Sequence, residues 1–259
     1  MATFLFDEII FGPVESRRLG VSLGINLLPT TAKVCSFDCI YCECGFTPKE
    51  YKIKVSLPTR QEVRERLETK LLEMKAEKRL PDVITFAGNG EPTLHRDFAG
   101  IIDDTIELRD QLAPDARIAV LSNATMLHRK PVFEALLKIK DNIQKLDSAF
   151  EETVRLIDCP KGVFNLEKTI EQLIAFNGKV IIQTMFIRGT FKGKTIDNTT
   201  EKEISAWIEL LKKINPLQVM IYTIARDTPI ETLKKVPLEE LNAIAERVRT
   251  AGFDVQVSG

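Results

Sequence analysis

The sequence predicts an α/β protein whose parallel sheet curls into a partial barrel. Short apolar segments alternate with longer amphipathic segments from residue 82 to the end of the chain, and this alternation is typical of βαβ units. The chain has 259 residues, of which 44% are hydrophobic, and a barrel of this kind commonly takes ~250 residues. About six such units would close the sheet only partway, although the alternation alone fits an open doubly wound sheet equally well.

The first part of the chain is predicted to hold a lead-in, one strand, one loop and one helix. Residues 1–18 form the lead-in, with a short strand over 4–10, and residues 21–28 form the first core strand. Thr59 and Glu62 have the spacing of a capping box, which predicts that a helix starts there. The buried face of this helix is predicted from apolar residues at helical spacing: Val63, Leu67, Leu71 and Met74.

Strands and helices then alternate along the rest of the chain. The predicted strands cover residues 82–87, 117–121, 143–147, 179–187 and 217–222, and residues 253–257 form a seventh or an edge strand. The predicted helices cover residues 97–112, 165–176 and 237–249, and two more begin near residues 131 and 200. No repeat or low-complexity segment divides the core at 19–259, so we expect residues 1–259 to form a single domain.

Composition narrows the function classes. The formal net charge is −1, whereas a dedicated nucleic-acid binder usually has a basic excess. The N-terminus has no basic region ahead of its apolar residues and does not predict a signal peptide, and no apolar run reaches the ~20 residues of a membrane helix. The sequence also lacks a G-x-G-x-x-G fingerprint and a P-loop. We expect a cytoplasmic protein that does not associate with membranes.

A cysteine-rich loop is the strongest chemical signal, because four of the five cysteines lie within residues 34–45. In a cytosolic protein such a cluster favours metal binding or catalysis over disulfides. Cys35, Cys39 and Cys42 have the spacing C-x3-C-x2-C, so three thiolates can hold three corners of one cubane iron–sulfur cluster. The fourth iron would keep an open, catalytic position. The alternatives are a zinc site that adds Cys44 and a cubane with Cys44 as fourth ligand; otherwise Cys44 and Cys159 are spare thiols.

Three motifs resemble one protein family. They are the cysteine spacing with Tyr41 before the last cysteine, the segment F-G-P-V-E-S-R-R-L-G-V-S-L-G-I-N-L-L-P from residue 11, and F-A-G-N-G-E-P-T-L-H from residue 86. Together they resemble the radical S-adenosylmethionine (SAM) superfamily. Within it they are similar to the branch of the wyosine-type tRNA-modifying enzymes and their short bacterial relatives, a group of Fe–S oxidoreductases. The resemblance implies the radical SAM fold, a partial (β/α)6 barrel of the TIM type.

The resemblance also implies a reaction and its cofactors. One site-open 4Fe–4S cluster, ligated by Cys35, Cys39 and Cys42, would cleave SAM reductively to a 5′-deoxyadenosyl radical that abstracts hydrogen from a substrate. A low-potential donor such as flavodoxin or ferredoxin would supply the electron. The wyosine-type enzymes have extra N-terminal cysteines for a second cluster, and no cysteine precedes Cys35 in this sequence.

The first SAM contacts implied by the resemblance lie in the cysteine loop and after the second core strand. Tyr41 would lie against the adenine, and its alternative is a core aromatic. The turn that contains Gly88, Gly90 and Glu91 would hold the amino group of SAM, since glycines let a backbone approach a ligand closely.

Further SAM contacts follow the third and fourth core strands. Ser122 and Asn123 would contact the ribose or the carboxylate, and their alternative is a helix-capping turn. Asp147 would bind the ribose hydroxyls, and its alternative is an ion pair with Lys145, because residues two apart on a strand share a face. In the family, the ends of later strands hold the adenine and the substrate, and these positions correspond here to Met185, Arg188, Gly189, Tyr222, Thr223 and Arg226.

The substrate is not given by any motif. The leading hypothesis, from the branch resemblance, is a tRNA base or a related molecule, so RNA is a candidate partner. The first alternative is a glycyl-radical protein or a peptide, because the chain is compact and near neutral. An alternative of another class is a zinc- or cluster-binding module without catalytic activity.

Overall fold

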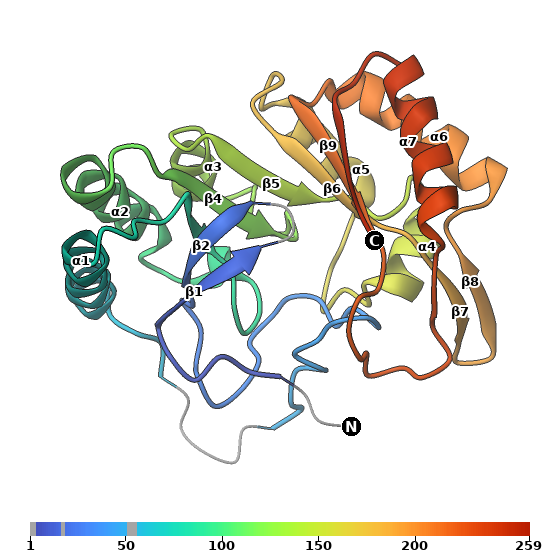
Figure 1. The fold of residues 1–259 in the computed structure, drawn as a ribbon. Coiled ribbons are helices and arrows are strands. Elements are labelled where there is room, and N and C mark those ends of the chain that lie inside the picture. The colour runs from blue at the N-terminus through green and yellow to red at the C-terminus, as the bar shows by residue number, and fades with distance from the viewer. Residues whose placement is uncertain (1–3, 17–18, 51–55) are drawn as a thin grey trace.

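The computed structural model describes residues 4–16, 19–50 and 56–259. Within these ranges the main sheet has eight strands, whose spatial order is β1 (Ile10–Ser16), β2 (Gly20–Ile25), β3 (Val83–Phe86), β4 (Arg117–Ser122), β5 (Asp141–Lys145), β6 (Ile181–Met185), β9 (Gln218–Tyr222) and β11 (Val255–Ser258) (Figure 1). The strand β1 is antiparallel to β2, and the other neighbouring pairs are parallel. The predicted parallel sheet is confirmed.

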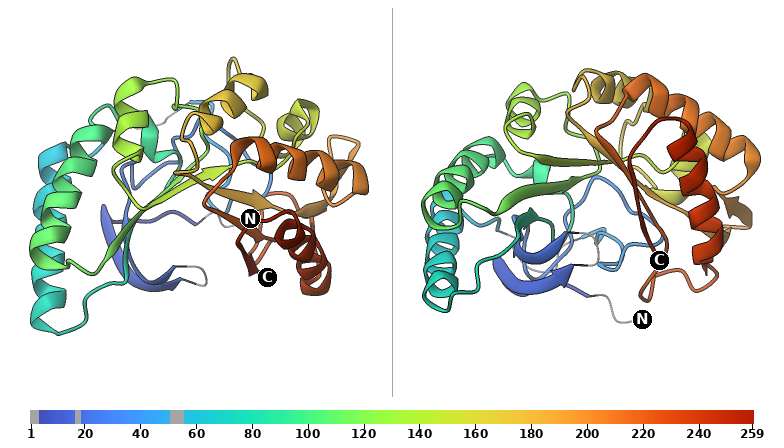
Figure 2. Two further views of the ribbon diagram at one scale, coloured as in Figure 1. Left: turned by 90° about the horizontal axis from the view of Figure 1, so that it is seen from above. Right: turned by 45° about the horizontal axis from the view of Figure 1, so that its top comes forward.

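Helices cover the outer side of this curled sheet. The described helices are α1 (Arg60–Ala76), α2 (Phe98–Leu112), α3 (Lys130–Leu136), α4 (Glu151–Ile157), α5 (Leu166–Ile174), α6 (Glu201–Ile214) and α7 (Leu238–Thr250). The long helices form an arc outside the sheet in Figure 2, and the cysteine loop after β2 lies on the opposite, inner side. The strands β1 and β11 are the two edges, so the sheet is a half-barrel. The predicted partial barrel is confirmed, and the alternative of a doubly wound sheet is wrong.

The two faces of the sheet belong to different apolar clusters. Strand residue Phe86 packs edge to face against Phe98 of α2, and Trp207 of α6 packs in the same way against Phe186. All four belong to the largest apolar cluster, which holds the helices on the sheet. Residues that alternate with these point to the inner face and form a smaller cluster, which includes Leu19, Val83, Ala119, Ile143, Ile181 and Met220. Because β2, β3, β4, β5 and β6 run parallel, the loops that follow them lie at the same end of the sheet.

The strand predicted over residues 4–10 is wrong. The backbone of Phe6 bonds to a side chain instead of a neighbouring strand: Phe6 N–H donates to Asn89 Oδ1 (2.8 Å), and Asn89 Nδ2 donates to Phe6 O (2.8 Å). The strand β1 starts only at Ile10 and pairs with β2. Residues 1–3 and 17–18 of the predicted lead-in lie outside the described ranges.

A second, antiparallel sheet was not predicted. It consists of β10 (Lys234–Lys235), β7 (Ile187–Phe191) and β8 (Lys194–Asp197), in this spatial order. The predicted strand over 179–187 ends earlier, at Met185, and the chain enters β7 after Phe186. Both Phe186 and Ile187 are buried. Because the apolar run continues from β6 into β7, hydrophobicity does not show where one strand ends and the next begins. The helix α4 was also not predicted.

The predicted capping box at the start of α1 is confirmed. Thr59 Oγ1 accepts from Glu62 N–H, and Thr59 N–H donates to the Glu62 carboxylate at 2.9 Å. The four apolar residues predicted for its inner face are all buried. In the described parts of the chain, none of the helices has the length and apolar character to cross a membrane, and the cytoplasmic location stays a prediction.

Candidate active site

The turn after β3 holds one side of the cysteine loop by backbone hydrogen bonds. Val34 N–H donates to Asn89 O (2.9 Å), and Glu91 N–H donates to Val34 O (3.1 Å). Gly90 lies between these bonds with φ +138°, and a Cβ atom there would be 1.8 Å from Val34 O. The close approach that the two glycines permit is therefore to the chain itself. At Gly88, with φ +142°, an added Cβ would meet the side chain of Asn26.

The segment after α4 holds the cysteine loop from the other side. Ile40 N–H donates to Ile157 O (2.9 Å), and Lys161 N–H donates to Ser36 O (2.8 Å). Between them, Asp38 N–H lies 3.0 Å from Asp158 O. This segment contains Cys159, whose pKa is raised by burial. The sequence did not predict this pairing, because the two segments are more than one hundred residues apart and neither forms a regular strand.

The three predicted ligand cysteines lie together in this loop with different surroundings. Cys35 Sγ accepts from Phe37 N–H (3.4 Å) and Asn123 Nδ2 (3.6 Å), and burial raises the pKa of Cys35 to about 12. Cys39 is buried, which raises its pKa well above the ordinary value. The pKa of Cys42 is lowered, chiefly by a hydrogen bond from Cys44.

A buried lysine, which no sequence pattern predicted, lies beside these thiols. Lys33 is 2% exposed, and its Nζ donates to Gly45 O (2.7 Å) and lies 3.6 Å from Asp38 Oδ1. Burial by itself would lower the pKa of Lys33, but the nearby Cys42, Cys35 and Cys39 raise it overall. The site therefore holds a fixed positive charge next to three groups that become anionic as metal ligands.

The donor set is chemically suited to an iron–sulfur cluster. Within the described residues, no three His, Cys, Asp or Glu side chains are grouped as ligands of one metal ion. A cubane spreads its cysteine ligands over separate irons, one thiolate to each. Three thiols in one loop, two N–H donors on Cys35 and the ammonium of Lys33 match the needs of an anionic cluster.

The turn after β4 connects the other two loops. The carboxylate of Glu91 is buried and accepts from Asn123 N–H (2.6 Å) and Thr93 N–H (3.0 Å). Asn123 Nδ2 in turn donates to Ser36 Oγ (2.9 Å), next to Cys35. Burial raises the pKa of Glu91. The structure thus places Glu91 and Asn123 against the cysteine loop, with Ser122 beside Glu91. The Glu91 oxygens already have partners inside the chain, and the SAM contacts of these three residues stay predictions.

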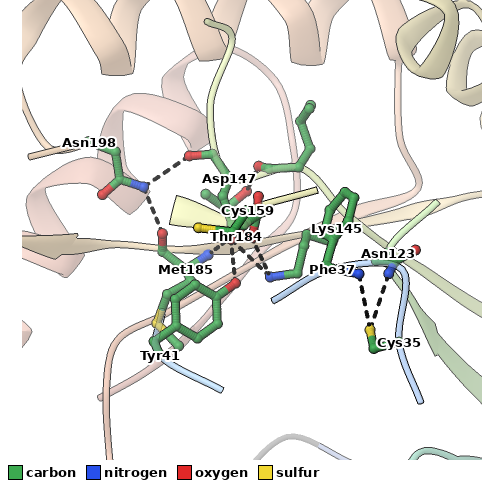
Figure 3. A network of polar contacts seen from close by, with 12 residues as sticks. Cys35, Phe37, Tyr41, Asn123, Lys145, Asp147, Cys159, Thr184, Met185 and Asn198 are labelled. Atoms are coloured by element: carbon green, nitrogen blue, oxygen red, sulfur yellow. Dashed lines mark hydrogen bonds and ion pairs between the residues drawn. The ribbon is translucent and has the colours of Figure 1, made fainter. Parts of the chain in front are cut away.

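A buried polar network lies on the far side of the loop (Figure 3). Tyr41 Oη donates to Asp147 Oδ2, which is 2.9 Å from Lys145 Nζ. Lys145 also lies 3.4 Å from Asp158 Oδ1, and its Nζ is 4.4 Å from the Tyr41 ring centroid. Burial by itself would lower the pKa of Lys145, but Asp147 and Asp158 raise it well above the ordinary value. The ion pair of Lys145 with Asp147 is confirmed, and the ribose contact of Asp147 stays a prediction.

Of the polar residues after β6 and β9, one contacts the cysteine loop and two are bonded elsewhere. Arg226 is exposed but reaches the cysteine loop, where Nη1 lies 2.6 Å from Glu43 Oε2. Arg188 is occupied elsewhere, because its guanidinium bonds Glu240 (2.5 Å) and Thr199 (2.6 Å). Thr223 is buried and donates to Phe186 O (2.9 Å). Arg226 is thus the residue of this set whose guanidinium contacts the predicted site.

Sequence reasoning missed several residues that hold the site together. Asn89 and Asn198 are buried and bond backbone groups on different segments. Within the ligand loop, Ser36 accepts from Asn123, and Asp38 N–H donates to Asp158 O. A buried asparagine has the same appearance in a sequence as an exposed one. The G-N-G-E-P motif contained Asn89, but only the fold shows its partners.

Comparison with known proteins defines the class of this enzyme. The family model described as the radical SAM superfamily matches residues 30–190, which is more than half of the chain and includes the cysteine loop and the turns after β3, β4 and β5. The chain belongs to the radical SAM superfamily, and it is therefore an enzyme. The alternative of a binding module without catalytic activity is wrong.

Relatives in sequence place it more narrowly, with the UPF0026 proteins. The chain is 32% identical over 240 residues to UPF0026 protein MJ1312 of Methanocaldococcus jannaschii. This match covers 91% of this chain and 70% of that protein. It is also 33% identical over 232 residues to a protein named GTPase Obg of Brachyspira hyodysenteriae, which covers 90% of this chain. The match spans only 32% of that second protein, about a third of its length.

Solved structures share the fold at low sequence identity. A radical SAM methyltransferase from Sphaerobacter thermophilus has a TM-score of 0.67 at 14% identity, over 92% of this chain and 65% of that chain. SuiB of Streptococcus suis bound to SAM has a TM-score of 0.63 at 16% identity, over 91% and 50%. TYW1 with a lysine-pyruvate adduct bound has a TM-score of 0.62 at 17% identity, over 88% and 73%. These similarities support the half-barrel fold.

Proposed function

We propose that the chain binds one 4Fe–4S cluster through Cys35, Cys39 and Cys42 and uses it to cleave SAM. When bound, the cluster and SAM supply an electron and the 5′-deoxyadenosyl radical that abstracts hydrogen from the substrate. The observation that carries the proposal is the cysteine loop itself. It holds three thiols beside a buried ammonium, and loops from both halves of the barrel fix its position.

The residues around the loop are proposed to orient SAM and to exclude water. The proposed SAM contacts are Tyr41 in the loop itself, Gly88, Gly90 and Glu91 in the turn after β3, Ser122 at the end of β4, and Asp147 after β5. A low-potential flavodoxin or ferredoxin is the proposed electron donor. We also propose that residues 1–259 act as one domain, since one sheet contains both β1 and β11.

For the substrate, we propose a base of RNA or a related molecule. The fold does not separate this class from peptides, because SuiB bound to its precursor peptide and TYW1 have similar TM-scores of 0.63 and 0.62. The G-P-V-E-S-R-R-L-G and G-N-G-E-P motifs favour the branch of the tRNA-modifying enzymes.

The reaction is nevertheless proposed to differ from that of the wyosine-type enzymes, to which the resemblance attributes a second cluster held by extra cysteines. The sequence has five cysteines, so only Cys44 and Cys159 remain outside the proposed ligand set, too few to hold a second cluster of this kind.

Anaerobic reconstitution tests the reaction. The full chain, loaded with iron and sulfide and given dithionite and SAM, is expected to form 5′-deoxyadenosine, measured by liquid chromatography. Cys39→Ala is expected to abolish product formation, and Cys159→Ser, the matched control outside the proposed ligand set, is expected to retain it. Zinc bound tightly with no SAM cleavage would contradict the proposal, and so would an active Cys39→Ala variant.

A nucleoside comparison tests the substrate class. Total RNA from a deletion strain and its parent is digested and analysed by liquid chromatography and mass spectrometry. A modified nucleoside that disappears on deletion and returns with the wild-type chain, but not with Cys39→Ala, would support RNA. Identical nucleosides together with a peptide modification lost on deletion would favour the peptide alternative.

A further inference from the structure

We infer that Asn123 is a positioning residue that acts on the cluster ligand Cys35, and that its amide sets the reduction potential of the bound cluster. The inference rests on the proposed function, because it concerns the charge on a ligand sulfur. It assigns to Asn123 a role other than direct contact with the ribose or carboxylate of SAM.

The geometry places the Asn123 amide on the sulfur. Asn123 Nδ2 lies 3.6 Å from Cys35 Sγ and 2.9 Å from Ser36 Oγ, and Figure 3 shows it beside Phe37 N, which donates to the same sulfur at 3.4 Å. Asn123 is 7% exposed. An amide that donates to two atoms of the ligand loop has no N–H left over for the ribose.

The backbone N–H and the side-chain oxygen of Asn123 are also occupied. Its N–H donates to Glu91 Oε2 at 2.6 Å, and its Oδ1 accepts from Thr125 N–H (3.1 Å) and from Thr125 Oγ1 (2.7 Å). These contacts fix the amide orientation, since a flipped amide would set its NH₂ group against the two Thr125 donors. The side chain is therefore held with its donors toward the loop.

A hydrogen bond to a ligand sulfur acts on the redox equilibrium. Reduction adds one electron, which increases the negative charge on the ligand sulfurs, and an N–H donor stabilises that charge more in the reduced than in the oxidised state. Hydrogen bonds to the sulfurs are among the features that set cluster potentials, and groups behind the ligands tune a metal site in general. Loss of the Asn123 amide should therefore make the midpoint potential more negative.

A redox titration of the reconstituted full chain without SAM, followed by electron paramagnetic resonance, tests this role. For Asn123→Ala we expect the preference for the reduced state to fall about tenfold, a shift of about 59 mV to more negative potential for one electron. Asn123→Asp keeps the shape but replaces the donor with a negative charge, so we expect a larger shift in the same direction. This near-isosteric variant decides the question if Asn123→Ala does not fold.

Thr125→Ala is the matched control. It removes the hydroxyl contacts to Asn123 and to Ser36 (2.6 Å) but leaves the Thr125 N–H bond and the sulfur donor, so we expect the wild-type midpoint. The inference is overturned if Asn123→Asp binds the cluster with an unchanged midpoint, or if Thr125→Ala shifts it equally. If the wild-type chain binds no cluster, both the proposed function and this inference are overturned. If the chain cleaves SAM normally but the Asn123 variants have the wild-type midpoint potential, only the inference is overturned.

Discussion

Among single residues, Gly90 connects backbone geometry to the site most directly. Its φ of +138° and its contact with Val34 O leave no room for a side chain. The same turn carries Asn89 and Glu91, whose side chains bond to the lead-in and to the turn after β4. One short turn after β3 thus fixes the cysteine loop and two further segments, and its backbone can adopt this course only with glycine at position 90.

We predict that Gly90→Ala lowers the free energy of unfolding by about 3–5 kcal/mol, because it adds a clash to a strained backbone. Urea denaturation followed by circular dichroism measures this change. Gly193→Ala is the matched control: Gly193 also has a positive φ (+73°), but nothing lies within 4 Å of its added Cβ, so we expect a loss of about 1 kcal/mol. Equal losses in the two variants would show that the contact with Val34 is unimportant.

At the level of elements, two helices begin with the same sequence pattern but use it differently. In α1, Glu62 completes the capping box at the surface. In α6, Thr200 caps the helix in the same way, but the Glu203 carboxylate binds Ser148 Oγ (2.6 Å) and Thr153 Oγ1 (2.6 Å). The second glutamate therefore ties α6 to the segment that leads from β5 into α4.

We predict that Glu203→Ala lowers the free energy of unfolding by about 2 kcal/mol, because it leaves two largely buried hydroxyls without their acceptor. Glu62→Ala, the control with the same local pattern, is expected to change stability only slightly. Thermal or urea unfolding of both variants checks the difference. The tertiary role of Glu203 would be contradicted by equal effects.

A second element-level prediction concerns the contact between α1 and α2. Arg60 holds Asp104 with two hydrogen bonds, 2.6 and 2.7 Å, which keep the pKa of Asp104 below its ordinary value. A lowered carboxyl pKa contributes stability above the unfolded pKa of about 3.9, and this contribution is lost as the pH falls through the folded pKa. Asp104→Asn is expected to cost about 1 kcal/mol at pH 7, discounted because Arg60 is half exposed.

Unfolding measured from pH 7 down to pH 3 tests this assignment. The stabilities of wild type and Asp104→Asn are expected to converge below about pH 4. Asp103→Asn, on the same helix, removes a half-exposed partner of Lys138 and should change little at pH 7. A constant gap between wild type and Asp104→Asn at every pH would rule out the ion pair as the cause.

For the whole molecule, one buried side chain connects the N-terminal lead-in to the site. Asn89 is 0% exposed, and its amide bonds Phe6 and Pro29 O (2.9 Å). Asn89 O also accepts from Val34 N–H. Phe6 in the lead-in, Pro29 in the segment after β2 and Val34 in the cysteine loop are therefore all bonded by one residue from the turn after β3. They lie up to 83 residues from it in the sequence.

We predict that Asn89→Ala lowers the free energy of unfolding by about 2–3 kcal/mol, since it leaves backbone groups on two segments unpaired. Hydrogen exchange followed by mass spectrometry is expected to show faster exchange of the Phe6 amide. Asn165→Ala, which removes only the cap of α5 at Lys168 N–H, is the control and should leave Phe6 protection unchanged. Wild-type exchange at Phe6 in Asn89→Ala would contradict the proposed connection.

The sequence by itself determined the order of the central parallel strands, from β2 to β9, and the family resemblance, from which the half-barrel was expected. Hydrophobic periodicity and capping residues such as Thr59 act over a few positions, so they can be read along the chain. The cysteine spacing and the G-N-G-E-P turn also indicated the site, because the residues of each motif are close in sequence.

Only the tertiary structure decided which polar groups meet at the site. Lys33 beside the cysteines, Asn123 on Cys35 and the pairing of residues 36–40 with residues 157–161 join segments that are distant in the chain. The break between β6 and β7 was equally hidden, since both sides are apolar. Hydrogen bonds and charges act through space at a few ångströms, and a sequence does not record which distant residues the folded backbone brings within that range.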